Sequence, residues 1–99
     1  MAQTPYTLRK SERDLIWIAH AVLFDLMGAD EIREKAIEQL RLCLIAQVAW
    51  SKQHGYPLMQ CYFAAPKEYW TPPFEFMEMP SDEEIAACKF EAVVGVTER

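Results

Sequence analysis

The sequence predicts an α+β domain in which an antiparallel helical hairpin packs on a small antiparallel sheet. Three observations favour this class. An apolar run of thirteen residues begins at Leu15, a long segment with helical periodicity follows it, and beyond Gly55 the apolar residues recur at alternate positions. The chain has 99 residues, which suits a single domain spanning 1–99 with one hydrophobic core.

The first predicted elements are a loose N-terminal arm and a helix. Residues 1–10 are polar and include a proline, so we expect an arm without its own packing. A helix is predicted over about 12–27, with Ser11 as its N-cap and Asp14 at the third helical position in a capping-box-like arrangement. Gly28 is a natural residue to end it.

A second helix is predicted over about 31–53, with Asp30 as N-cap and Gly55 beyond its end. The connection between the two helices is short, so they should fold back on each other as an antiparallel hairpin. The first half of this helix has a charged face. From Leu42 onward, and including Ile45, that face becomes apolar, so it must be covered by the C-terminal half of the chain or by a second copy.

The predicted sheet comes from the second half of the chain. Alternating apolar residues favour strands at 58–65 and 74–79, which would pair antiparallel across the Pro-bounded loop 66–73. The β-branched segment 91–97 is predicted to be a third strand, and the alternative is that the preceding helix continues through it.

A short helix is predicted between these strands, over about 82–90. Ser81 is a good N-cap, and Glu84 stands where a capping box places its acidic partner. Further acids fill the first turn, where they interact favourably with the helix dipole.

Composition excludes several classes of function. The net charge of −5 and the lack of a basic run argue against direct nucleic-acid binding, although an acidic protein can engage a basic surface on a partner. Cys43, Cys61 and Cys88 are odd in number and far apart, which indicates reduced thiols and a cytoplasmic protein rather than a disulfide framework. The apolar run is too short and too interrupted for a membrane span, so no membrane association is expected.

No motif predicts a catalytic residue, a metal site or a cofactor. The chain lacks CxxC, HxxxH and HExxH spacings and any glycine-rich phosphate loop. Cys43 and His20 could meet across the predicted hairpin, but no oxyanion turn or orienting acid accompanies them, and a core role is the favoured interpretation of both. The sequence therefore indicates a protein that is not an enzyme.

The chain carries more apolar surface around the first helix than one small core requires. At helical spacing, one stripe of this segment packs in the core and a second lies beside it, which is either further core or an interface. Aromatic residues around the double proline form another candidate, because Tyr and Trp on loops are frequent partner anchors. The predicted partner-binding or dimer-interface residues are Trp17, His20, Phe24, Leu42, Ile45, Tyr69, Trp70 and Phe74.

We therefore expect a non-enzymatic regulatory protein that acts by protein–protein binding, as a homodimer. It would be an inhibitor or anti-activator that sequesters a larger partner, such as a transcription regulator or other nucleic-acid machinery. The alternative is a small-ligand-binding or enzymatic dimer with an apolar pocket near His20, Gln47 and Trp50.

Overall fold

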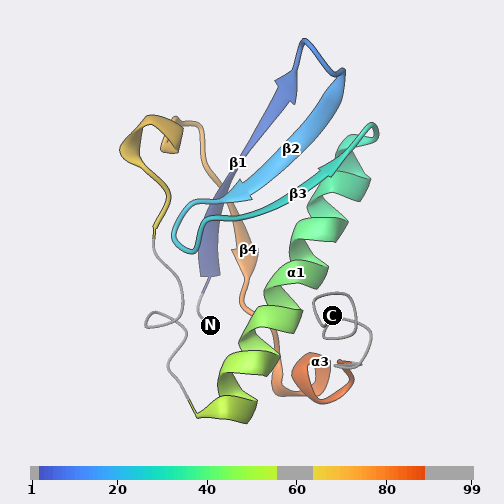
Figure 1. The fold of residues 1–99 in the computed structure, drawn as a ribbon, viewed down its shortest axis with the longest axis vertical. Helices are drawn as coiled ribbons and strands as arrows, with labels where there is room; N and C mark the ends of the chain where they lie inside the picture. Colours follow the sequence, from blue (N-terminus) through green and yellow to red (C-terminus); the bar gives the residue numbers. More distant parts are fainter. Residues whose placement is uncertain (1–2, 56–63, 89–99) are drawn as a thin grey trace, which may run out of the picture.

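A four-stranded antiparallel sheet and a long helix form the two layers of the computed structural model, which describes residues 3–55 and 64–88 (Figure 1). This confirms the predicted α+β class. The strands lie in the order β3-β2-β1-β4. In chain order the elements are β1 (Gln3–Ser11), β2 (Ile16–Ala21), β3 (Leu26–Asp30), α1 (Arg33–His54), the 3₁₀ helix η1 (Lys67–Tyr69), β4 (Glu75–Glu78) and α3 (Asp82–Ala86).

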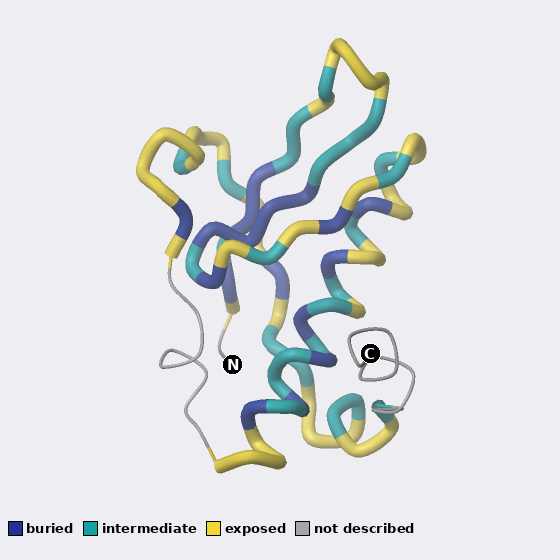
Figure 2. The backbone as a smooth tube through the Cα atoms, in the orientation of Figure 1, coloured by how far each residue is buried: buried dark blue, intermediate teal, exposed yellow. Residues whose placement is uncertain are grey.

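Helix α1 covers one face of the sheet and packs mainly on β3 and β2 (Figure 1). Gly28 of β3 makes this close packing possible, since a Cβ there would lie 2.4 Å from the backbone oxygen of Ala36 and from the backbone nitrogen of Leu40. Buried residues run along the inner side of α1 and the middle of the strands (Figure 2). The core cluster consists of Tyr6, Ala19, Ala21, Phe24, Ala36, Leu40, Leu44 and Met77.

The first three strands are joined by two turns of four residues each, at 12–15 and 22–25. The last residue of each turn, Leu15 and Asp25, has a left-handed backbone with φ of 56°. The Leu15 amide donates to the carbonyl of Ser11 at 2.7 Å, which closes the first turn. Four-residue hairpin loops of this kind leave the two strands in direct antiparallel register.

The predicted helix over 12–27 is wrong, and with it the helical hairpin, because this segment forms two turns and strands β2 and β3. A strand that is covered on both faces is apolar at almost every position, and such a run resembles a buried helix. The predicted N-cap Ser11 does accept a hydrogen bond from the Asp14 amide at 3.2 Å, but it does so within a β-turn. Gly28 lies inside a strand instead of ending a helix.

The predicted loose arm over 1–10 is also wrong, because β1 begins at Gln3 and lies between β2 and β4 in the sheet. Thr7 pairs with His20 of β2, and Thr4 pairs with Met77 of β4. Pro5 is accommodated within the β1–β4 register, opposite Phe76.

The second predicted helix is confirmed as α1, with its end at Gly55 in the left-handed conformation (φ 74°). Its start differs by two residues from the prediction. Ile32 holds the N-cap position without a side-chain cap, while Asp30 accepts a hydrogen bond from the Ile32 amide at 2.9 Å.

Two of the C-terminal predictions are confirmed. Strand β4 lies within the predicted 74–79, although its partner in the described residues is β1 rather than 58–65. Helix α3 begins where predicted, with the Ser81–Glu84 capping box formed, and its helical residues end at Ala86. The predicted strand at 58–65 falls mostly outside the described residues, and the predicted strand at 91–97 falls entirely outside them.

Candidate protein-interaction surface

The face of the sheet that points away from α1 carries the residues of greatest functional interest, and we call it the outer face. Successive residues of a strand point to opposite faces, so Ala19 and Ala21 face α1 while Ile16, Ile18 and His20 face outward. The cross-strand register extends this face onto β3 and β1, since directly paired residues share a face.

One part of the outer face is apolar and incompletely covered. Ile18 pairs with Ala29. The next residue of β3 that faces outward is Met27, which lies two residues before Ala29 and pairs with His20; Met27 is 51% exposed. Ile16 and Ile18 are half-buried and Ala29 is exposed. Leu15, which is 64% exposed, lies beside Ile16 at the end of the first hairpin. We call these five residues the outer patch.

The outer patch lies beside an edge of the sheet that α1 already closes in part. The amide of Ala29 points away from β2 and donates to the side-chain oxygen of Gln39 at 3.4 Å. The side-chain nitrogen of Gln39 in turn donates to the Asp30 carboxylate at 3.1 Å. A helix residue that occupies edge groups in this way discourages the addition of another strand, so a partner would meet the face of the sheet rather than its edge.

A polar cluster borders the outer patch on its other side. The buried His20 ring lies 2.7 Å from the Asp25 carboxylate through Nε2 and 3.4 Å from the Arg9 guanidinium through Nδ1. Tyr69 of η1 covers this ring edge-to-face, with 5.5 Å between the ring centroids. The Arg9 guanidinium also lies 5.4 Å above the Tyr69 ring, a cation–π geometry.

The contacts of His20 select one tautomer of its neutral ring. A guanidinium can only donate hydrogen bonds, so in this tautomer Nδ1 accepts from Arg9 and Nε2–H donates to Asp25. Both ring nitrogens are occupied, and the ring has no free lone pair with which to act as a general base. This cluster attaches η1 and the β2–β3 turn to the sheet, and its geometry indicates a structural role.

The Cys43 thiol is partly shielded from solvent, and the acidic residues of the described part do not gather into a metal-binding group. Burial raises the pKa of the Cys43 thiol, so this thiol is less ionised than an exposed one and is a weaker nucleophile. Among residues 3–55 and 64–88, no group of three or more His, Cys, Asp or Glu side chains is arranged to hold a metal ion.

The predicted stripe of Trp17, His20 and Phe24 does not form one surface. Trp17 and His20 are an odd number of residues apart in a strand, so they face opposite sides of the sheet. Trp17 packs beside the core, with the Lys10 ammonium 5.8 Å from its ring centroid, and Phe24 is buried in the β2–β3 turn. His20 and Phe24 are thus buried within the chain and Trp17 is half-buried beside the core, and the part of these residues in an interface stays a prediction.

The remaining predicted interface residues fall in two places. Leu42 is 59% exposed on α1, and Ile45, one turn further along the helix, is half-buried. Tyr69 covers His20 next to the outer patch. Trp70 donates from Nε1 to the Ala65 carbonyl at 2.9 Å and meets Phe74 edge-to-face at 6.4 Å, so both rings stabilise the 64–74 segment.

The predicted alternative pocket is not assembled in this fold. His20 lies on the outer face, whereas Gln47 and Trp50 belong to α1 on the other side of the sheet. The Trp50 ring stacks on His54, with 4.1 Å between the ring centroids. The sheet thus separates the histidine from the two helix residues with which it was grouped.

Sequence reasoning missed the outer patch because it assigned Ile16, Ile18 and Met27 to a helix. The segment IWIAHA gives only a weak signal, because five of its six residues are apolar and no polar residue alternates with them; its two β-branched residues, Ile16 and Ile18, are the feature that favours a strand. Read with a period of two, the same residues predict a strand with an apolar outward face.

Comparison with known proteins adds no relative from which a role could be transferred. In the part of the chain that the structure describes, no helix is both long and apolar enough to cross a membrane. No family model, curated protein or solved structure matches this chain.

Proposed function

We propose that this protein is a non-enzymatic regulatory protein that binds another protein through the outer patch. In this role it sequesters a larger partner, as an inhibitor or anti-activator of a transcription regulator or other nucleic-acid machinery. The proposal places it in the cytoplasm, where the free thiols of Cys43 and Cys88 stay reduced.

The observation that carries the proposal is the exposed apolar outer patch on a rigid sheet. Isolated exposed apolar residues are common, but here four apolar residues on the same face of two paired strands adjoin one another, and Leu15 of the preceding turn follows directly on Ile16. Methionine is flexible and polarisable, so Met27 can adapt to the shape of a partner.

The backbone at Leu15 supports the same conclusion. A left-handed φ of 56° suits glycine or asparagine, and a leucine there costs about 1 kcal/mol or more in backbone strain. The leucine side chain recovers little of this cost within the described protein, because it is 64% exposed. Contact with a partner would bury this side chain, and the free energy of burial would offset the backbone strain at Leu15.

We also propose that two copies associate through this patch in the absence of the larger partner, so that self-association and partner binding compete for the same surface. In a dimer with two-fold symmetry the same surface of each subunit faces its copy. An uncharged apolar patch can do this because no like charges are brought together. Sedimentation velocity across a range of concentrations tests this point directly. A monomer at every concentration would contradict the dimer and leave the binding of a larger partner to be tested separately.

The test of the proposed function compares two double variants with matched exposure. L15Q/M27Q replaces the two most exposed apolar side chains of the outer patch, which are 64% and 51% exposed. I32Q/L42Q makes the same chemical change on α1 and just before it, at residues 50% and 59% exposed, and it also tests the interface role that the sequence predicts for Leu42. Partner protein retained from the native host should fall at least about tenfold with L15Q/M27Q and stay unchanged with I32Q/L42Q. Equal retention by all three baits would overturn the proposal.

A further inference from the structure

A groove opens between α1 and β4, on the side of the molecule away from the outer patch. Helix α1 lies against β3 and β2, where Gly28 admits it, and it diverges from the sheet toward β4. The space left between them has a volume of about 450 Å³ and is open to solvent. We propose that this groove binds a basic segment of a partner protein, with an apolar side chain on its floor and Lys or Arg side chains at its rim.

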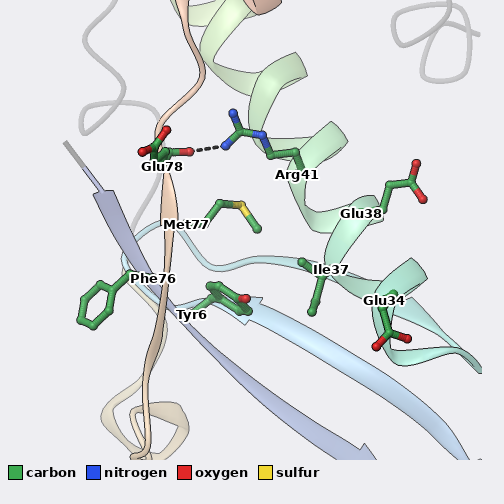
Figure 3. Close-up of a pocket in the computed structure, with 8 residues that line it drawn as sticks. All are labelled: Tyr6, Glu34, Ile37, Glu38, Arg41, Phe76, Met77 and Glu78. Atoms are coloured by element: carbon green, nitrogen blue, oxygen red, sulfur yellow. Dashed lines mark hydrogen bonds between the residues drawn. The ribbon is translucent and has the colours of Figure 1, made fainter. Parts of the chain in front are cut away.

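The floor of the groove is apolar. Tyr6 of β1, Ile37 of α1 and Met77 of β4 point toward one another across the space (Figure 3). Burial raises the pKa of the Tyr6 hydroxyl, with the Glu75 carboxylate as a further cause, which is consistent with a poorly hydrated floor. An aliphatic side chain of a partner could bind there without removing water from many polar groups of the floor.

The rim of the groove carries an excess of negative charge. Glu34 and Glu38 stand one turn apart on α1, and Glu78 lies across from them on β4 (Figure 3). Arg41 is the one basic residue of the lining, and its guanidinium already makes two hydrogen bonds within the protein. It donates to the Glu78 carbonyl and, at 2.6 Å, to the Glu84 carboxylate.

Arg33 does not change this balance. It lies 3.7 Å from Glu34, which is already counted on the rim, and 3.5 Å from Glu75, so the one positive charge of Arg33 comes with the one additional negative charge of Glu75. The Glu38 and Glu78 carboxylates make no ion pair with any described residue. A cationic partner segment therefore meets carboxylates that are free to pair with it, and a neutral or acidic segment does not gain this attraction.

The inferred partner segment carries Lys or Arg side chains, which are also the side chains by which nucleic-acid-binding proteins neutralise phosphates. If this protein binds that segment, nucleic acid cannot bind the same Lys and Arg side chains at the same time. The inference concerns a different surface from the outer patch, and either one can fail without the other.

A fluorescein-labelled peptide with one central leucine flanked on each side by two arginines is a suitable probe, with binding followed by fluorescence anisotropy. E34Q/E38Q removes two rim charges without changing side-chain shape, and its matched control E12Q/E83Q removes two exposed charges outside the groove. Affinity should fall about threefold to tenfold for E34Q/E38Q and remain unchanged for E12Q/E83Q. The L15Q/M27Q variant should bind the peptide like the unsubstituted protein.

Exchanging the charges of the rim and of the peptide tests whether they contact each other, because this experiment predicts a gain of binding rather than a loss. E34R/E38R should bind the corresponding peptide with glutamates in place of arginines, and bind it better than the unsubstituted protein does. A peptide with serine in place of the central leucine should bind more weakly than the parent peptide if the floor is used. The inference is overturned if the arginine peptide does not bind, if both glutamine pairs weaken it equally, or if the charge exchange fails in a folded variant.

Discussion

Gly28 is the residue on which the packing of the two layers depends, and replacing it with alanine tests the fold. An added Cβ would lie 2.4 Å from two backbone atoms of α1, whereas an ordinary contact of this type is at least 3.4 Å. The helix and the sheet would have to separate locally by about 1 Å, because backbone atoms cannot rotate away as a side chain can. The change therefore acts on the main contact between α1 and β3.

The expected cost of G28A is about 3 kcal/mol of unfolding free energy, at the upper end of the range for overpacking substitutions. For a domain of this size that loss lowers the Tm by roughly 12 to 24 °C. Gly55 offers the matched control. G55A makes the same residue change at φ 74° with nothing within 4 Å of the new Cβ, so only the left-handed backbone is penalised, by about 1 kcal/mol.

Urea unfolding followed by circular dichroism measures both variants against the unsubstituted protein. The two substitutions change the entropy of the unfolded chain in the same way, so the difference between them reports on the folded state. If Gly28 instead ended a helix, as the sequence had suggested, the two costs would be equal. Costs of G28A and G55A that agree within about 0.5 kcal/mol would refute the described packing of α1 on β3.

Three further substitutions test local features. L15G should raise the unfolding free energy by about 0.5–1 kcal/mol, since glycine relieves the left-handed strain at some entropic cost, while partner capture falls; a drop in stability would contradict the strain argument. H20A should lower the unfolding free energy by about 2–4 kcal/mol, because it leaves a cavity and removes the partner of Asp25; a thermal melt close to that of the unsubstituted protein would argue against the polar cluster. The Arg41 hydrogen bond, followed by the Ser81 amide, lowers the pKa of Glu84 below its usual 4.5, so this stabilisation is present above pH 4.5 and is lost as the pH falls through the lowered pKa. Accordingly, the stability difference between the unsubstituted protein and R41Q should shrink at acidic pH, and NMR titration should show a higher Glu84 pKa in R41Q; an unchanged pKa would contradict the contact.

Local signals identified the elements whose boundaries depend on neighbouring residues alone. The Ser81–Glu84 capping box predicts the start of α3 because both partners are three residues apart in the chain. Gly55 likewise predicts the end of α1 through its left-handed conformation. These features need no knowledge of the tertiary fold.

The strands of the first half could not be recognised from such signals. The first hairpin turn places Leu15 in the left-handed position where glycine, asparagine or aspartate would have marked a turn, and the second places Asp25 there, inside an apolar run that is compatible with a helix. Between these turns, β2 is apolar on both faces, so the alternation that identifies a half-exposed strand is nearly absent. The tertiary packing of β2 between α1 and the η1 segment decides its conformation.

The same limit applied to the candidate surface. In a helix, Trp17 and His20 would share one face because they are three residues apart. In a strand, residues three apart point to opposite faces. Tyr69 was predicted from the aromatic cluster around the double proline, and the structure places it beside the outer patch, where its part in binding stays a prediction. The acidic groove depends on β1, β4 and α1 together, and no sequence neighbourhood contains all three.

The most direct test of the central claim is quantitative mass spectrometry of the proteins that three baits retain from the native host: the unsubstituted chain, L15Q/M27Q and I32Q/L42Q. We expect one protein to be retained by the first and third baits and to fall at least about tenfold with the second, while all three baits keep the same circular dichroism spectrum. Retention of the same proteins at the same level by all three baits would contradict binding through the outer patch.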